Sequence, residues 1–97
     1  MRIAILDRAE RDLIEGLHFY DKQADGLGSY FLTNLYADIE SLRISAGIHN
    51  KPYKDYHRML SKRFPFAIFY KKKGNTVFIH AVLDCRRNPA WTRGRLE

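Results

Sequence analysis

The chain has 97 residues, of which 45% are hydrophobic and 29% are charged, and its formal net charge is +6. This length suffices for one hydrophobic core and excludes two, so we expect residues 1–97 to form a single domain. No apolar run approaches the roughly 20 residues that span a bilayer, which excludes a membrane-spanning class.

The N-terminal segment, the cysteine content and the distribution of charge indicate where the protein acts and what kind of partner it has. The N-terminal apolar run has only four residues, which is unlike a secretory signal. One cysteine, Cys85, excludes an internal disulfide and suits a reducing cytosol, so we expect a cytoplasmic protein. Residues 1–50 carry five Lys/Arg against eight Asp/Glu, a net charge of −3, whereas residues 51–97 carry twelve against three, a net charge of +9. This asymmetry predicts a basic surface for an acidic partner, although a solvated surface without a partner is an equal alternative.

The first half of the chain predicts a strand followed by two helices. Residues Arg2–Leu6 are apolar enough for a short strand, and Asp7 stands where a helix N-cap would, three residues before Glu10. Apolar residues then recur at helical spacing in two series, separated by the glycine-containing segment 25–28. The first series is Ala9, Leu13, Leu17 and Tyr20, and the second is Phe31, Leu35, Ile39, Leu42 and Ala46.

Two glycines add detail to the helical prediction. Gly47 has the position of a C′ residue that ends the second helix. Gly16, inside the first helix, would be explained by the close approach of another helix. The short link predicts an antiparallel helical hairpin, and the sheet would cover its apolar stripes.

The second half predicts a loop and three strands. Residues Ile48–Asp55 indicate a loop, and Tyr56–Ser61 a short strand. Two runs rich in β-branched and aromatic residues, Phe64–Tyr70 and Val77–Leu83, flank the polar segment Lys71–Thr76. In that segment Gly74-Asn75 suits a tight reversal, which predicts an antiparallel β-hairpin that ends before Asn88-Pro89. The segment Trp91–Leu96 is too short and too basic to be assigned. The order β-α-α-β-β-β predicts an α+β fold with a helical hairpin packed on a small antiparallel sheet.

Several residue types that can bind metals or catalyse reactions are present, but they also occur in ordinary structural roles. The histidines do not stand at metal-binding spacing, so we expect neither a metal site nor a cofactor. Cys85 lacks an evident base and is more simply a residue at the end of a strand. Metal-independent RNA cleavage needs a base, an acid and cationic groups, and the chain supplies these types. The residues concerned are Lys54, Tyr56, His57, Arg58, Arg63, Tyr70, Arg86 and Arg87.

Aromatic residues on the helices suggest a second type of site. Phe19, Tyr30 and Tyr36 exceed what one sheet can cover and would then mark a docking surface for another helix.

Several motifs, in this order and spacing, resemble the RelE/ParE superfamily of toxins from bacterial toxin–antitoxin modules, which are often described as plasmid stabilisation proteins. The motifs are A-x-x-D-L (9–13), F-Y-D-x-Q (19–23), G-L-G-x-x-F-L (26–32), R-F-P-F-A-I-F-Y (63–70) and A-V-L-D-C-R-R-N-P-A-W (81–91). The resemblance covers nearly the whole chain. It implies an N-terminal helical hairpin on a small sheet, and an acidic protein antitoxin that wraps the toxin in a hetero-oligomer.

The superfamily contains two kinds of activity. RelE-like members cut mRNA on the ribosome with basic residues on the sheet and a tyrosine near the C-terminus, whereas ParE-like members poison DNA gyrase. This sequence has Ala67 where the RelE pattern has an arginine, Leu60 in place of a lysine, and Trp91 in place of the tyrosine. The resemblance therefore implies a ParE-like inhibitor that binds rather than catalyses. We expect the contacts with the target or its DNA to come from Arg58, Arg63, Arg86, Arg87 and Trp91.

The alternative is a RelE-like, ribosome-dependent endoribonuclease that acts on mRNA. Its catalytic groups would come from Lys54, His57, Arg58, Tyr70 and Arg87.

Overall fold

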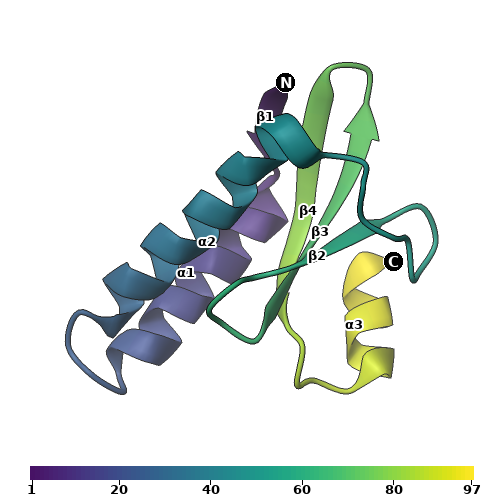
Figure 1. Cartoon of the computed structure of the whole chain (residues 1–97). Helices are drawn as coiled ribbons and strands as arrows, with labels where there is room; N and C mark the ends of the chain where they lie inside the picture. Colours follow the sequence, from purple (N-terminus) through teal and green to yellow (C-terminus); the bar gives the residue numbers. More distant parts are fainter.

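The computed structural model describes all residues, 1–97, and forms two main layers, a helical hairpin and a four-stranded sheet (Figure 1). The strand order in the sheet is β1-β4-β3-β2. The elements are β1 (Arg2–Ile5), α1 (Asp7–Asp21), α2 (Leu27–Ser45), β2 (His57–Leu60), β3 (Phe66–Lys73), β4 (Thr76–Asp84) and α3 (Pro89–Leu96). The predicted α+β class and the order β-α-α-β-β-β are confirmed, and α3 is added at the end.

The sheet is mixed rather than purely antiparallel. Strands β2, β3 and β4 pair antiparallel, as the hairpin pattern predicts. Strand β1, however, pairs parallel with β4, with Arg2 opposite Thr76 and Ile5 opposite Ile79. A parallel neighbour requires a crossover, and the helical hairpin lies within the long connection from β1 to the rest of the sheet.

The two long helices approach each other closely at glycines, as the sequence predicts for Gly16. A Cβ atom added to Gly16 would lie 2.5 Å from the ring of Phe31 in α2. A Cβ atom added to Gly28 would meet the backbone carbonyl oxygen of Leu17 in α1. At the other end of α2, Gly47 follows the helix with φ of +99°, which confirms its role as C′ residue.

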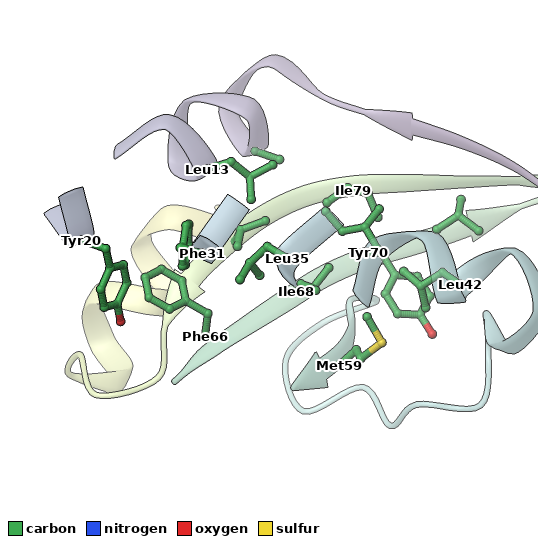
Figure 2. Close-up of a cluster of buried hydrophobic side chains, with 14 residues drawn as sticks. Leu13, Tyr20, Phe31, Leu35, Leu42, Met59, Phe66, Ile68, Tyr70 and Ile79 are labelled. Atoms are coloured by element: carbon green, nitrogen blue, oxygen red, sulfur yellow. The ribbon is translucent and has the colours of Figure 1, made fainter. Parts of the chain in front are cut away.

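The main core lies between the helical hairpin and one face of the sheet (Figure 2). Apolar residues of α1 and α2, such as Leu13, Leu35 and Leu42, pack on Ile68 and Ile79 of the sheet. The burial of these apolar side chains is the main contribution to the stability of the folded chain. The helices therefore occupy one face of the sheet, and the opposite face, called the open face below, remains for α3.

Several predicted boundaries are wrong, beginning with the start of α1. Asp7 is the first residue of α1 rather than its N-cap, because Leu6 precedes the helix and its carbonyl oxygen accepts from the Glu10 amide at 3.0 Å. The Asp7 carboxylate lies in the first turn, where the helix dipole favours it.

The hairpin strands also begin and end elsewhere than predicted. Strand β3 starts at Phe66, not at Phe64, because Pro65 has no N–H to donate to a ladder. The strands then extend to Lys73 and from Thr76, which leaves a two-residue turn. Only Gly74 in that turn has positive φ, +60°, which is typical of a type II′ turn.

Helix α3 is short but has a clear N-terminal signal. The Asn88 side chain accepts from the Ala90 amide at 2.7 Å, and Pro89 occupies the first turn. Leu96 is buried on the open face against Ala67 and Phe69 of β3 and against two residues of β4. None of the three helices has the length and hydrophobicity needed to cross a bilayer.

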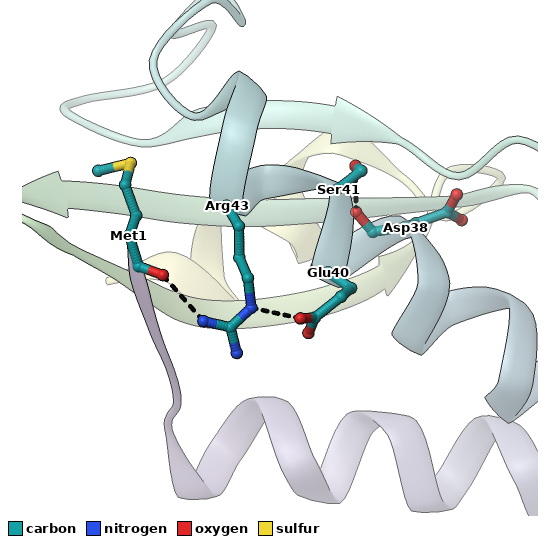
Figure 3. A network of polar contacts seen from close by, with 5 residues as sticks. All are labelled: Met1, Asp38, Glu40, Ser41 and Arg43. Carbon is teal, nitrogen blue, oxygen red and sulfur yellow. Dashed lines mark hydrogen bonds and ion pairs between the residues drawn. The ribbon is translucent and has the colours of Figure 1, made fainter.

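Polar contacts of α2 tie distant parts of the chain together (Figure 3). Arg43 donates from Nη1 to the Met1 carbonyl oxygen at 2.8 Å and pairs through Nε with Glu40, which fixes the N-terminus beside α2. Two residues before Arg43, the Ser41 hydroxyl donates to the Asp38 carbonyl oxygen at 2.6 Å. The buried Asp38 carboxylate itself accepts from the Ser61 hydroxyl at 2.6 Å and so holds the β2–β3 connection.

Candidate functional site

The candidate site is a groove between α3 and the open face of the sheet. Its volume is about 230 Å³, and Ala67, Phe69 and Leu83 contribute apolar parts of its lining. The charged side chains of the lining are Arg58, Asp84, Arg87 and Arg93. This groove, called the α3 groove below, is therefore lined by apolar side chains and by three guanidinium groups.

Strand geometry brings Arg58 and Arg87 to this groove from different parts of the chain. Arg58 lies on β2 opposite Phe69, and alternation along the strand points it to the open face. Arg87 follows β4, where its amide donates to the Asp84 carbonyl oxygen at 3.3 Å. Neither guanidinium forms an ion pair, so both remain available to an anionic ligand.

Trp91 lies beside two arginines. The Arg87 guanidinium carbon is 4.0 Å from the centroid of the Trp91 ring, and that of Arg95 is 5.8 Å away. Stacking of this kind holds a guanidinium in place without neutralising its charge. Of the five predicted target-binding residues, the structure thus brings Arg58, Arg87 and Trp91 to the same region.

Arg86 and Arg63 lie elsewhere. Arg86 is exposed and donates through Nε and Nη2 to the two carboxylate oxygens of Asp84, at 2.9 and 2.7 Å. This bidentate contact holds the pKa of Asp84 below its usual value. Arg63 is exposed in the β2–β3 connection and forms no ion pair. Neither residue lines the α3 groove.

The alternative set of catalytic residues is divided between the two faces of the sheet. Tyr70 is fully buried in the main core, and its ring is stacked on that of His57 at 4.8 Å between centroids. These two residues face the helices, whereas their neighbours Arg58 and Phe69 face α3. Lys54 pairs with Glu97 at 3.0 Å, at the end of α3. A base, an acid and cationic groups must converge on one reacting centre, and these side chains do not converge.

Hydrogen bonds hold Tyr70 in the main core and the half-buried His57 beside it. The Tyr70 hydroxyl accepts from the Gly47 amide at 3.0 Å and lies 2.6 Å from Nδ1 of His49. Nδ1 of His57 lies 2.6 Å from the His49 carbonyl oxygen. Burial lowers the pKa of His49 and raises that of Tyr70, because it disfavours the charged form of each group. The cluster fastens the loop after α2 to the sheet.

The structure reveals an ion pair between a buried carboxylate and a partly exposed arginine, which the sequence patterns do not predict. Asp12 in α1 accepts from the Val82 amide at 3.0 Å and forms an ion pair with Nη2 of Arg95 at 2.8 Å. Burial nevertheless raises the pKa of Asp12 above its usual value. Arg95 also contacts Trp91, and both residues belong to α3, so Asp12 holds this helix against α1 and β4. The A-x-x-D-L motif contains this residue, but its partners are 70 or more residues away.

No group of three or more His, Cys, Asp or Glu side chains in the structure is placed to hold a metal ion. Cys85 is a free, exposed thiol that lines the α3 groove. The groove therefore offers cations and apolar surface as its chemistry, which suits binding of an anionic or acidic group.

Comparisons with known proteins place this geometry in a known fold. No protein-family model matches the sequence, and no curated protein matches it significantly. Among solved structures, the chain is similar to a chain of "Chromosomal ParDE TA system from P. aeruginosa", with a TM-score of 0.75. The match covers 84% of this chain and 92% of that chain at 15% sequence identity. The match shows a shared fold, which agrees with the helical hairpin on a small sheet that the motif resemblance implies.

Proposed function

We propose that the chain is the toxin of a type II toxin–antitoxin module and that it inhibits DNA gyrase by binding, as a ParE-like protein. The observation that carries this proposal is the match of 84% of the chain to a chain of a ParDE system. The order and spacing of the sequence motifs support it independently.

The division of the alternative catalytic set favours binding over RNA cleavage. Tyr70 would have to leave the core to reach an RNA phosphate, and it would lose two hydrogen-bonding partners in doing so. Arg58 and Arg87, in contrast, line the α3 groove and need no rearrangement to meet a ligand there, and Trp91 lies against Arg87. We infer that Arg58, Arg87 and Trp91 form the centre of the target contact and that Arg63 and Arg86 contribute at its margin.

The proposed neutralising partner is an acidic protein antitoxin that forms a hetero-oligomer with this chain. Exposed aromatic side chains on the helical hairpin support the proposal, since Phe19, Tyr30 and Tyr36 are 50%, 49% and 41% exposed. Such residues favour docking of an amphipathic helix. The net charge of +9 in residues 51–97 complements an acidic partner.

A supercoiling assay with purified gyrase, relaxed plasmid and ATP tests the target. We expect the wild-type protein to reduce supercoiling, and Arg86→Ala/Arg87→Ala to lose this inhibition, because both guanidinium groups are exposed and only one of them forms an ion pair. The matched control is Arg8→Ala/Arg11→Ala, which removes the same charge from exposed positions of α1. Equal inhibition by both double variants would contradict the assigned contacts.

Failure of folded wild-type protein to affect gyrase would contradict the proposed target. New 5′ ends within translated codons, mapped in cellular mRNA after induction, would then establish the RelE-like alternative. Co-purification with the product of a neighbouring gene tests the antitoxin, and lack of binding would contradict that part of the proposal.

A further inference from the structure

The open face of the sheet has a second half that α3 does not cover. Helix α3 packs on the half that contains Phe69 and Leu83, whereas the β3–β4 turn lies at the opposite end of these strands (Figure 1). Side chains on the uncovered half follow from strand alternation, because Ile3, Val77 and Tyr70 pack into the main core on the other face. The open-face residues of this half are Arg2, Ala4, Lys71, Lys73, Thr76 and Phe78.

The register arranges these residues in two rows across three strands. One row contains Arg2, Thr76 and Lys73, and the next contains Ala4, Phe78 and Lys71. Neighbouring strands are about 4.8 Å apart, so each row extends over roughly 10 Å. The half-buried ring of Phe78 on the central strand lies beside Lys71 in its own row. The cationic side chains of Arg2 and Lys73 lie diagonally from it, in the next row. These six residues are called the Phe78 platform below.

The positive charge of this platform is not neutralised within the chain. None of Arg2, Lys71 and Lys73 forms an ion pair. A hollow of about 420 Å³ lies beside Phe78 and is lined by Lys71, Lys72 and Lys73. Its one acidic residue, Asp55, is held by Lys51 at 2.9 Å. The Lys71 ammonium lies 4.5 Å from the centroid of the Tyr56 ring, which positions it near the rim of the hollow.

We infer that the Phe78 platform binds single-stranded nucleic acid, with a base stacked on Phe78 and backbone phosphates contacted by Arg2, Lys71 and Lys73. Sheet faces that combine an accessible aromatic ring with flanking cations bind single strands in this manner. The platform is separate from the α3 groove, and this inference does not rest on the proposed inhibition of gyrase.

A simpler role explains only part of the arrangement. Strand β2 pairs with β3 no further than Tyr70, so the segment Lys71–Lys73 has a free backbone edge. Lysines on a free edge prevent strand-to-strand aggregation. That role accounts for the lysines but not for Arg2 and Phe78, which lie on other strands and share the same face.

The test measures binding of fluorescein-labelled oligothymidine (about 12 nucleotides) and oligouridine of equal length by fluorescence anisotropy between about 50 and 200 mM salt. These concentrations span about a twofold change in screening length. We expect Arg2→Gln/Lys71→Gln/Lys73→Gln to weaken binding and to lower the slope of log affinity against log salt by about 2, since each single-strand phosphate contact contributes about 0.7. Equal binding of both oligonucleotides would show that the platform recognises the phosphates and bases that DNA and RNA share. Tighter binding of one of them would identify DNA or RNA as the ligand.

The matched control is Arg8→Gln/Arg11→Gln/Lys22→Gln, which removes three charges from exposed positions in and directly after α1. Its slope should equal that of the wild-type protein, and an equal decrease in both triple variants would overturn the inference in favour of net charge. Phe78→Leu should weaken binding on the order of tenfold, whereas Phe78→Tyr, which keeps the ring, should bind as the wild-type protein does. Unchanged affinity of folded Phe78→Leu, or tighter binding of an acidic peptide than of either oligonucleotide, would also overturn it.

Discussion

The ion pair between Asp12 and Arg95 connects α1 to α3, and its removal should have a large effect. In Arg95→Met, the Asp12 carboxylate would keep the Val82 amide as its donor but lose its only cation. Breaking a fully buried pair costs about 3–5 kcal/mol, because one charge is left uncompensated. Asp12 is 4% exposed but Arg95 is 24% exposed, so solvent reduces the cost. We expect a loss of about 2–3 kcal/mol in the free energy of unfolding at pH 8.

The pH dependence of this loss identifies its cause. Burial already raises the pKa of Asp12, and without Arg95 the carboxyl pKa should rise further. A carboxyl whose folded pKa exceeds its unfolded value binds more protons in the native state. Its contribution to stability is therefore fully present below the unfolded pKa and is lost as pH rises through the folded pKa. The variant should lose less stability at pH 4 than at pH 8, relative to the wild-type protein.

Urea unfolding at both pH values, followed by circular dichroism, measures these differences. The control is Asp12→Asn/Arg95→Met, whose amide does not titrate but can still accept from the Val82 amide. Its stability relative to the wild-type protein should vary less with pH than that of Arg95→Met. Identical urea midpoints for Arg95→Met and the wild-type protein at pH 4 and pH 8 would refute a role for this pair in holding α3.

Two further substitutions test the packing. Gly28→Ala should destabilise the protein by about 1–3 kcal/mol, because the new methyl group meets the backbone carbonyl of Leu17. The control is Gly94→Ala, because no atom lies within 4 Å of a Cβ atom added at Gly94. This variant should stabilise the protein in thermal unfolding. Equal effects of the two substitutions would contradict the close contact between α1 and α2. Tyr70→Phe should cost about 1–3 kcal/mol, because the Gly47 amide and His49 lose their buried partner. Hydrogen exchange of the Gly47 amide should accelerate in this variant, and unchanged protection would contradict the proposed tether.

Local patterns predict the long elements well. The helices follow from apolar spacing, and the hairpin from its β-branched and aromatic runs around a glycine-containing turn. Residue Gly16 even predicts the close approach of α2, because a glycine inside a helix costs stability unless a neighbouring segment needs the space. These features depend on residues near one another in sequence, where propensity and periodicity act directly.

Features that depend on distant partners could not be predicted. The parallel pairing of β1 with β4 has no local signal, since one apolar run suits either direction. Asn88-Pro89 marks the end of the hairpin in the sequence, although the same pair is also an N-cap and a first helical residue. The predicted site residues remain predictions, but the structure explains their distribution. Alternation along β2 and β3 sends Arg58 to the α3 groove and Tyr70 to the core.

The pairing of β1 with β4 also determines when the protein can fold during its synthesis. Strand Arg2–Ile5 finds its partner only at Thr76–Ile79, and Asp12 finds its partner only at Arg95. Contacts so distant in sequence form late, after most of the chain is available. A nascent chain therefore presents the helical hairpin without its sheet, and the α3 groove exists only after residues 89–96 have been synthesised.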